Sequence, residues 1–251
     1  MLTRRVIPSL LLRNGRLVKG VGYAAWRDAG NPATTARVYN AQGADELLLL
    51  DIEASRQNRA PDYASVAVVA KECSMPLTVG GGINSVERAH ACMEHGADKI
   101  CVTSTALDRP ELIAELAHVF GRQAVVLGID VTRAGQTRAL YDHRTGKPAP
   151  ARRWQEWMKE GVARGAGEIR LMAVDREGRR TGLDSALLKE AAELVDVPII
   201  LEGGAGSLDQ LDEAMTAGVE AVALGTLLVF SDNNIIKVKR FLSGAGHAVR
   251  I

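Results

Sequence analysis

One stretch of this 251-residue chain occurs twice, and its two copies lie 122 positions apart. Residues 76–85 read as an apolar run, a glycine turn and a serine, and residues 198–207 repeat that order. The match continues without a gap through the following segment, so that Ser104 aligns with Thr226. A repeat at about half the length of a chain predicts two similar half-domains that complete one fold.

Apolar runs of strand length alternate with amphipathic segments of helical length along the whole chain. We expect strands at residues 6–12, 47–51, 77–79, 100–102, 124–130, 169–174, 199–201 and 221–224. We expect helices at residues 32–42, 62–73, 85–95, 110–120, 153–164, 184–195, 207–217 and 234–242. Eight such units predict a single α/β domain over residues 1–251, a (β/α)8 TIM barrel built from half-barrels at about 1–122 and 123–251.

Composition narrows the classes of partner. The 31 basic and 30 acidic residues nearly cancel, which predicts no nucleic-acid partner. Pro8 interrupts the short apolar run near the N-terminus, so we expect no signal peptide or membrane segment and a cytoplasmic protein. The three cysteines and five histidines lack metal-ligand spacing, so we expect neither a metal site nor a cofactor.

The C-terminal ends of barrel strands, and the loops after them, carry the chemistry of this fold. The longest connections are expected at residues 13–31, 52–61 and 132–152, where loops could cover a substrate. Two glycine pairs also follow strands and are related by the 122-residue repeat. Glycine N–H groups, hydroxyls and helix N-termini together can hold a phosphate. The first predicted cradle is Gly81, Gly82, Thr103 and Ser104, and the second is Gly203, Gly204, Gly225 and Thr226.

A set of motifs spread over the whole chain identifies a family. The motifs lie at residues 18–20, 43–47, 50–52, 79–83, 96–99, 167–169, 175–178 and 203–206. With them the chain resembles the cyclase subunit of imidazole glycerol phosphate synthase (HisF). The resemblance implies a barrel that accepts ammonia from a HisH-like glutaminase and converts a two-phosphate ribonucleotide intermediate of histidine synthesis into an imidazole. It also implies that the two cradles, with Gly178, hold the two phosphates of a phosphorylated ligand.

The chemistry of this family depends on two aspartates, at the ends of the first and fifth strands. Asp130 ends the fifth strand here, and Lys19 and Asp51 are retained, so the resemblance makes these three residues catalytic candidates. Leu11 stands where the first aspartate is expected. A positioned acid or base contributes roughly 10²- to 10⁴-fold in rate, and leucine cannot transfer a proton. We therefore expect the cyclase reaction to be impaired.

Four other pocket positions also differ from the family. Thr103 replaces an asparagine, Met172 a threonine, Glu177 an aspartate and Glu202 a serine. One interpretation is drift, in which Glu202 or Glu177 substitutes for the lost carboxylate from across the barrel. The other interpretation is a pocket altered for a different reaction.

The first residues of four strands are charged and point into the predicted barrel. Arg5, Glu46, Lys99 and Glu168 can pair into a closed ring at its N-terminal mouth. A ring of this kind can simply stabilise the barrel floor, although apolar residues would stabilise it at least as well. By resemblance the ring gates a passage for ammonia, and Asp45 and Asp98 lie beside it where the glutaminase docks.

Three functions remain open at this stage. The leading hypothesis combines the retained ring with the altered pocket: a HisF-like subunit that has diverged toward acetamidino-sugar biosynthesis, with a separate sugar amidotransferase completing the reaction. Residues 7–12 and 51–56 resemble that branch of the family. The second hypothesis is a working cyclase of histidine synthesis. The third is a non-catalytic activator of the glutaminase.

Overall fold

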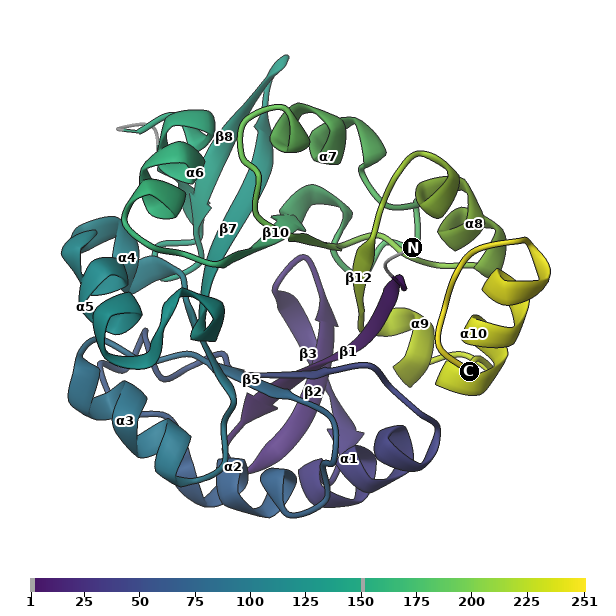
Figure 1. Ribbon diagram of the computed structural model, residues 1–251, viewed down its shortest axis with the longest axis horizontal. Helices are drawn as coiled ribbons and strands as arrows, with labels where there is room; N and C mark the ends of the chain where they lie inside the picture. Colours follow the sequence, from purple (N-terminus) through teal and green to yellow (C-terminus); the bar gives the residue numbers. More distant parts are fainter. Residues whose placement is uncertain (1–2, 150–151) are drawn as a thin grey trace.

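The protein is a closed barrel of eight parallel strands surrounded by helices (Figure 1). The computed structural model describes residues 3–149 and 152–251, so residues 150–151 of the expected loop at 132–152 lie outside the described residues. The strand β1 (Arg5–Arg13) closes the barrel because it pairs both with the next barrel strand in the chain, β4 (Leu47–Asp51), and with the last one, β12 (Ala221–Leu224). The other barrel strands are β5 (Leu77–Gly80), β6 (Lys99–Val102), β7 (Val125–Ala134), β10 (Glu168–Ala173) and β11 (Ile199–Glu202). The predicted TIM barrel is confirmed.

Eight helices follow the barrel strands where the sequence predicts them. They are α1 (Pro32–Ala41), α2 (Tyr63–Ala70), α3 (Val86–Glu94), α5 (Glu111–Phe120), α6 (Trp154–Ala163), α7 (Ser185–Ala192), α8 (Leu208–Thr216) and α10 (Ile235–Gly244). The two copies of the repeat begin their helices alike, since Ser85 caps α3 and Ser207 caps α8 through their side-chain oxygens. There are also two short helices, α4 (Ser104–Asp108) and α9 (Thr226–Val229). They begin at Ser104 and Thr226, which the 122-residue repeat aligns with each other.

Two segments predicted as loops are antiparallel hairpins instead. After β1 the chain forms β2 (Arg16–Val21) and β3 (Ala24–Gly30), and after β7 it forms β8 (Thr137–Asp142) and β9 (Lys147–Pro148). The long connections expected at 13–31 and 132–152 are present, but the strands within them were not predicted. Asn14 and Gly15, both with positive φ, form the turn between β1 and β2. An Asn-Gly pair is a strong hairpin signal that the helix and strand periodicity hides.

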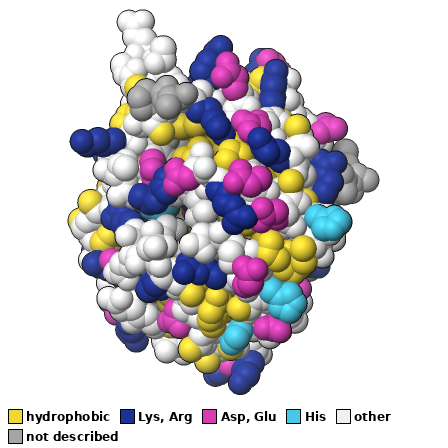
Figure 2. Space-filling view, turned by 90° about the vertical axis from the view of Figure 1, so that its left-hand side faces the viewer, with side chains coloured by type: hydrophobic (Ala, Val, Ile, Leu, Met, Phe, Trp, Pro, Cys, Tyr) yellow, Lys and Arg dark blue, Asp and Glu magenta, His cyan; other side chains and the backbone are white. Residues whose placement is uncertain are grey.

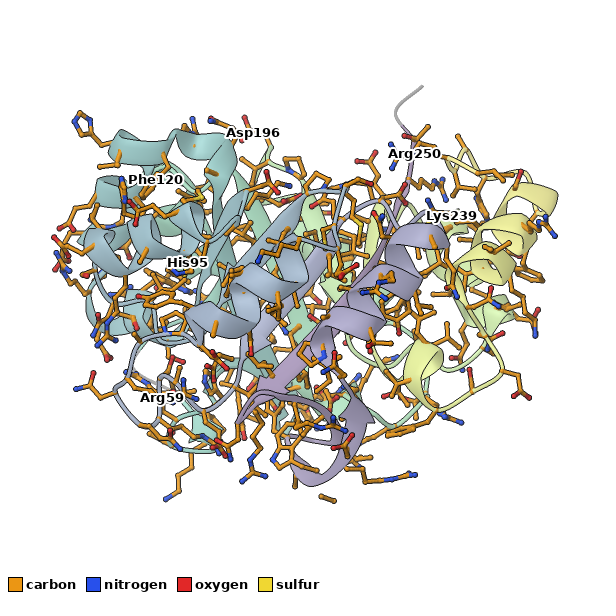
Figure 3. The ribbon with its side chains drawn as sticks, turned by 90° about the horizontal axis from the view of Figure 1, so that it is seen from below. Arg59, His95, Phe120, Asp196, Lys239 and Arg250 are labelled. Atoms are coloured by element: carbon orange, nitrogen blue, oxygen red, sulfur yellow. The ribbon has the colours of Figure 1, made fainter. Side chains whose placement is uncertain are left out.

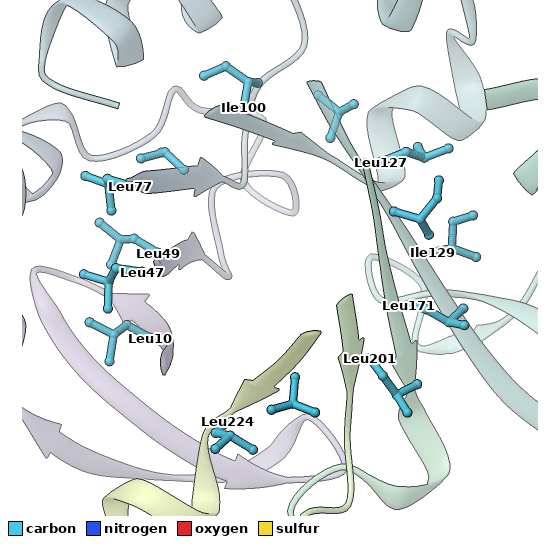
Figure 4. Packing of buried hydrophobic residues seen from close by; sticks show 14 of the residues in the cluster. Leu10, Leu47, Leu49, Leu77, Ile100, Leu127, Ile129, Leu171, Leu201 and Leu224 are labelled. Atoms are coloured by element: carbon cyan, nitrogen blue, oxygen red, sulfur yellow. The ribbon is translucent and has the colours of Figure 1, made fainter. Parts of the chain in front are cut away.

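Alternation along each strand divides the buried residues into two sets. One set faces outward and packs beneath the helices, as Figure 4 shows for Leu49, Leu127 and Leu201. A smaller set lies inside the barrel and includes Ile7 and Leu48. Because both faces are covered, the barrel strands are apolar almost throughout.

The two ends of the barrel can be told apart by the residues near them and by the position of the chain termini. Figure 3 shows Arg59 near the C-terminal ends of the strands and Lys239 and Arg250 near the opposite end. The chain termini meet at that opposite end, where the Arg4 N–H donates to the Ala248 carbonyl at 2.7 Å. On the side where α3, α5 and α6 lie, basic and acidic side chains are interspersed (Figure 2). Among the described residues, no helix is both long and apolar enough to cross a membrane.

The proposed half-barrels each contain four barrel strands. The division near residue 122 leaves β1, β4, β5 and β6 in the first half and the other four in the second. Each half also begins with a long strand that folds back into an antiparallel partner, β1 with β2 and β7 with β8. The origin of the barrel from two similar halves stays a prediction.

We expect Gly161→Ala to destabilise the fold by about 1–3 kcal/mol, because overpacking a filled core costs that much. Gly161 lies in α6, and a Cβ there would collide with the side chain of Leu127, which is 0 % exposed. Urea unfolding followed by circular dichroism measures the change. The matched control is Gly244→Ala in α10, where a Cβ meets open space, and it should stabilise by roughly 0.4–1 kcal/mol. Equal effects of the two substitutions would contradict this packing.

Candidate functional site

Two glycines after β5 form the first of the expected cradles. Gly81 and Gly82 have φ angles of +95° and +73°, a region that residues with a Cβ rarely adopt. A Cβ at Gly81 would also collide with the Asp51 carbonyl, so this turn has room for backbone alone. The glycines line one cavity with Thr103 and Ser104, at the start of α4. The structure therefore brings together the four residues of the first cradle.

The second cradle lies after β11 and β12. Gly203 and Gly204 both have a φ angle of +101° and line a second cavity with Gly178, Gly225 and Thr226. The Thr226 Oγ1 atom is buried and makes no hydrogen bond within the described part of the chain. Buried hydroxyls normally have a partner. The hydroxyl is therefore suited to donate to an anion held by the glycine turn.

Leu11 faces the first cavity. Its side chain is 5 % exposed and lines that cavity together with Asp130. On the neighbouring strand β4, Leu50 pairs in register with Leu11 and lines the same cavity. The position where the resemblance implies a carboxylate therefore presents an apolar surface to the cavity and does not turn away from it.

Arg170 is an interior residue that sequence reasoning missed. It lies on β10 between Glu168 and Met172, and alternation along the strand points all three inward. Its guanidinium lies 3.2 Å from Asp130 Oδ1 and 2.5 Å from Glu202 Oε2. The alternation that assigned Glu168 to the interior could have identified Arg170 as well.

Asp130 and Glu202 hold Arg170 in its charged form. Burial alone would lower the pKa of Arg170, but Glu202 and Asp130 outweigh that effect and raise it well above its ordinary value. The guanidinium is therefore charged, and both carboxylates lie in a buried ion-pair cluster. Glu202 lines the second cavity, whereas Leu11 lines the first. Substitution of Glu202 for the missing carboxylate stays a prediction, and this geometry does not favour it.

Lys19 and Glu177 form a second buried ion pair. The Lys19 ammonium donates to the Glu177 carboxylate, and the two residues are 6 % and 1 % exposed. The Glu177 carbonyl also accepts from the Gly22 N–H at 3.1 Å, which fastens the β2–β3 hairpin over the barrel. Both side chains line the second cavity. Glu177 is therefore a paired carboxylate at the second cradle.

Asp51 lies at the C-terminal end of β4, as predicted, and its carboxylate holds the loop that follows. It accepts from the Arg59 guanidinium through both oxygens, at 2.6 and 2.8 Å. It also accepts from the backbone N–H groups of Ala54 and Asp62, both at 3.2 Å. These bonds give Asp51 a positioning role in residues 52–61, and its catalytic role stays a prediction.

The two antiparallel hairpins meet above the first cavity. Tyr23, between β2 and β3, and Tyr141 on β8 have ring centroids 5.8 Å apart. The Tyr23 hydroxyl donates to Asp130 at 3.4 Å, and burial raises the pKa of Tyr23 well above its ordinary value. His143, on the turn after β8, places Nδ1 3.1 Å from Ser104 Oγ. The sequence patterns did not indicate these groups, because both hairpins were predicted as loops.

The charged residues at the N-terminal mouth form a closed ring. Arg5 donates to Glu46 and, at 2.6 Å, to Glu168. Lys99 Nζ lies 2.9 Å from both carboxylates. Burial would lower the pKa of Lys99, but Glu168 and Glu46 outweigh it and raise that pKa. The expected geometry of the ring is present, and its role as an ammonia gate stays a prediction.

Asp45 and Asp98 also lie at this end of the barrel. Asp45 accepts from the Val6 N–H at 2.8 Å and from Lys239 Nζ at 2.7 Å. Asp98 accepts from the Leu77 N–H at 2.8 Å. Both carboxylates therefore hold the starts of strands, and their expected contact with a glutaminase stays a prediction.

Within residues 3–149 and 152–251, no group of three or more His, Cys, Asp or Glu side chains is arranged to hold a metal ion. The described cysteines are free thiols. Burial raises the pKa of Cys92 to about 12 and that of Cys101 to about 11. These two thiols are therefore protonated at neutral pH and poor nucleophiles.

The fold and the site define a (β/α)8-barrel protein with two glycine cradles at one end and a closed ring of charges at the other. Residues 5–234 match the family described as "Histidine biosynthesis protein". The chain is 43 % identical over 252 residues to "Imidazole glycerol phosphate synthase subunit HisF" of Chloroherpeton thalassium, with 100 % of both chains covered. Its identity to the subunit of the same name is 42 % in Prosthecochloris aestuarii and 41 % in Anoxybacillus flavithermus, again with both chains covered completely. The chain belongs to the HisF family.

We expect Arg170→Met to lower the free energy of unfolding by about 3–5 kcal/mol, because it leaves Asp130 and Glu202 as unpaired buried carboxylates. Urea unfolding measures the loss. Adding Asp130→Asn and Glu202→Gln should recover most of it. The control, Arg37→Met, breaks a pair with Glu72 in which the arginine is 68 % exposed, and should cost less than about 1 kcal/mol. A loss at Arg170 as small as the control's would contradict the buried cluster.

Proposed function

We propose that this chain is the ammonia-accepting subunit of a glutamine amidotransferase whose acceptor is not the intermediate of imidazole formation. In this function a HisH-like glutaminase docks at the N-terminal mouth and releases ammonia into the barrel. The ammonia passes to a phosphorylated ligand at the C-terminal end. The observation that carries the proposal is the pairing of an intact ring, Arg5, Glu46, Lys99 and Glu168, with Leu11 in the cavity above it.

The interior above the ring supports the passage of a neutral molecule. Ile7, Leu48, Ile200, Ala221 and Ala223 form an apolar cluster inside the barrel. An apolar lining excludes ammonium far more strongly than ammonia, because burying an unpaired charge is very costly. In the ring below, Glu46 and Glu168 each pair with both Arg5 and Lys99, so Lys99 can withdraw while Arg5 still pairs with both carboxylates. A filled apolar floor would offer no such route.

The chemistry of the first cavity supports a departure from imidazole formation. The family's reaction uses two carboxylates, and this cavity has Leu11 at one of the two positions. The remaining carboxylate, Asp130, is paired with Arg170 at 3.2 Å and accepts from Tyr23 at 3.4 Å. Neither position therefore offers a free acid or base. Because such a group typically contributes roughly 10²- to 10⁴-fold, the loss would be large.

The two cradles support a ligand with phosphate groups. Their glycine turns and hydroxyls suit anions, and the Thr226 Oγ1 atom is a buried donor with no partner in residues 3–149 and 152–251. Glu177 and Glu202 at the second cavity would repel a phosphate if they were unpaired. Lys19 and Arg170 neutralise them.

For the acceptor, we propose an acetamido sugar that becomes an acetamidino sugar for a surface polysaccharide, with a separate amidotransferase completing the reaction. The support is the resemblance of residues 7–12 and 51–56 to that branch of the family. Residues 7–12 contain Leu11, and residues 51–56 contain Arg56, which contacts the turn after β8. Both segments that resemble that branch therefore lie around the altered cavity.

We expect the purified chain, mixed with its glutaminase partner, glutamine and the two-phosphate intermediate of histidine synthesis, to form no imidazole glycerol phosphate above background. The reason is that Leu11 and paired Asp130 leave the cavity without two free carboxylates. Chromatography of the product measures the yield. The HisF subunit of Chloroherpeton thalassium with its glutaminase serves as the positive control. Turnover comparable to the control would overturn the proposal.

A second function, cyclase activity in histidine synthesis, is supported by the 43 % identity over the whole length of a HisF relative. It would need Asp130 to act with Glu202 or Glu177 as the second acid. Growth of a histidine auxotroph that lacks its cyclase, on expression of this chain, would decide in its favour. A third function, activation of the glutaminase without catalysis, requires that stimulation survive Asp130→Asn and ignore phosphate ligands.

We expect Lys99→Ala to uncouple glutamine hydrolysis from ammonia transfer. The substitution removes a cation from the ring and leaves Glu46 and Glu168 with Arg5 alone, so the floor should leak. In the reconstituted system, the ratio of ammonia released into solution to glutamate formed should rise. The matched control is Lys189→Ala on the exposed face of α7, which should leave the ratio unchanged. An unchanged ratio for Lys99→Ala would refute the gate.

A further inference from the structure

His143 is held in place by contacts from three other parts of the chain. Its carbonyl accepts from the Arg56 guanidinium at 2.8 Å. Its Nδ1 atom lies 3.1 Å from Ser104 Oγ and 4.0 Å from Asp130 Oδ2. The side chain is 22 % exposed, so the imidazole is mostly enclosed at the end of a turn.

The second nitrogen of His143 is available to a ligand. The hydrogen bonds of the described residues include Nδ1 of this ring, and none of them uses Nε2. The residue lines the first cavity together with Gly81, Gly82 and Ser104, the members of the first cradle. An anion bound to the cradle would therefore share a cavity with this imidazole, whose Nε2 atom is open to a ligand.

Charged groups from several elements face His143. Asp130 on β7 and Arg170 on β10 belong to one ion-pair cluster, in which Arg170 also binds Glu202. Arg56 lies on the loop after β4, and Asp142, beside His143, is paired with Arg144 at 2.8 Å. Burial is the largest effect and lowers the pKa of His143, with Asp130 and Asp142 acting in the opposite direction and Arg56 and Arg170 with it. The pKa of His143 is therefore below its ordinary 6.5, and the imidazole is neutral in the free protein at neutral pH.

We propose that His143 is a ligand of the first cradle that takes up a proton when a phosphate group binds there. In the complex, Nε2–H donates to a phosphate oxygen while Nδ1–H donates to Ser104 Oγ, which lies 3.1 Å away. An imidazolium has two N–H donors, and the site offers it an acceptor on each side. The proposal rests on the phosphorylated ligand of the proposed function, and adds a residue that the glycine motif does not contain.

The sign of the pH effect follows from the proton uptake. A bound dianion favours the charged imidazole and raises its pKa in the complex. Affinity is therefore greatest below the pKa of the free protein, which is itself below the ordinary 6.5. It falls as pH rises and levels off above the pKa of the complex. If binding raises that pKa by about one, the affinity falls about tenfold from a pH below the pKa of the free protein to a pH above the pKa of the complex.

Sulfate is the probe, because it remains a dianion across this range whereas phosphate changes its own charge. Titrations of isotope-labelled protein are followed by NMR at the amides of Gly81 and Gly82 for the first cradle. The amides of Gly203 and Gly204 report on the second cradle in the same sample. The second cavity is not lined by a histidine among the described residues and therefore serves as an internal control.

The variants are His143→Gln and a matched control, His90→Gln, whose histidine is 58 % exposed on α3. At the first cradle of the unmodified protein, we expect sulfate binding to be about tenfold weaker at the high-pH limit of the titration than at its low-pH limit. His143→Gln should remove most of that difference and leave the second cradle unchanged. His90→Gln should alter neither cradle.

Two results would overturn the inference. One is sulfate binding at the first cradle with the same pH dependence in His143→Gln as in the unmodified protein. The other is sulfate binding at the second cradle alone. A third result, in which neither cradle binds sulfate, inorganic phosphate or a sugar phosphate at any pH, would overturn both this inference and the phosphorylated ligand of the proposed function. The first two results would overturn the role of His143 alone.

Discussion

Every inward-facing charge described in this barrel has a partner, and that constraint shapes both of its ends. A buried unpaired charge costs several kcal/mol, so acids and bases inside a barrel must come in compensating sets. At the N-terminal mouth, two cations and two anions close a ring. At the other end the pairs are Lys19 with Glu177, and Arg170 with both Asp130 and Glu202. The residues in each group of paired charges determine which acids and bases are left free to react at that end of the barrel.

The same constraint explains why the carboxylates at the C-terminal end of the barrel are poor candidates for proton transfer. Asp130 is bound by Arg170 and Tyr23, Glu202 by Arg170, and Glu177 by Lys19. A carboxylate that is already engaged by a partner is not free to act on a proton of the substrate. In the proposed function, a family member that keeps the ring but pairs its acids in this way binds anions and conducts ammonia without the cyclase reaction. His143 remains as a titratable group with an open ring nitrogen in the first cavity.

Much of the site was accessible from sequence because its members follow simple periodic rules. The glycines of both cradles occur at equivalent places in the repeat, and barrel geometry puts all strand ends on one rim. Leu11 and Asp130 could be compared by aligning two strands, and the structure places both at one cavity. Alternation likewise placed Arg5 and Lys99 inside. These are local relations, and the closed sheet preserves them.

The sequence by itself determined the barrel, the positions of its strands and helices, and the missing carboxylate at the end of β1. The hydrophobic periodicity, the glycine turns and the internal repeat can all be read from the chain. A parallel barrel accommodates all three of them. Tertiary structure alone decided that Arg170 binds Asp130 and Glu202, and that the hairpins after β1 and β7 bring Tyr23 and His143 over the cavity. Those contacts join residues far apart in the chain, and their geometry depends on side-chain reach and on charge pairing across the closed barrel.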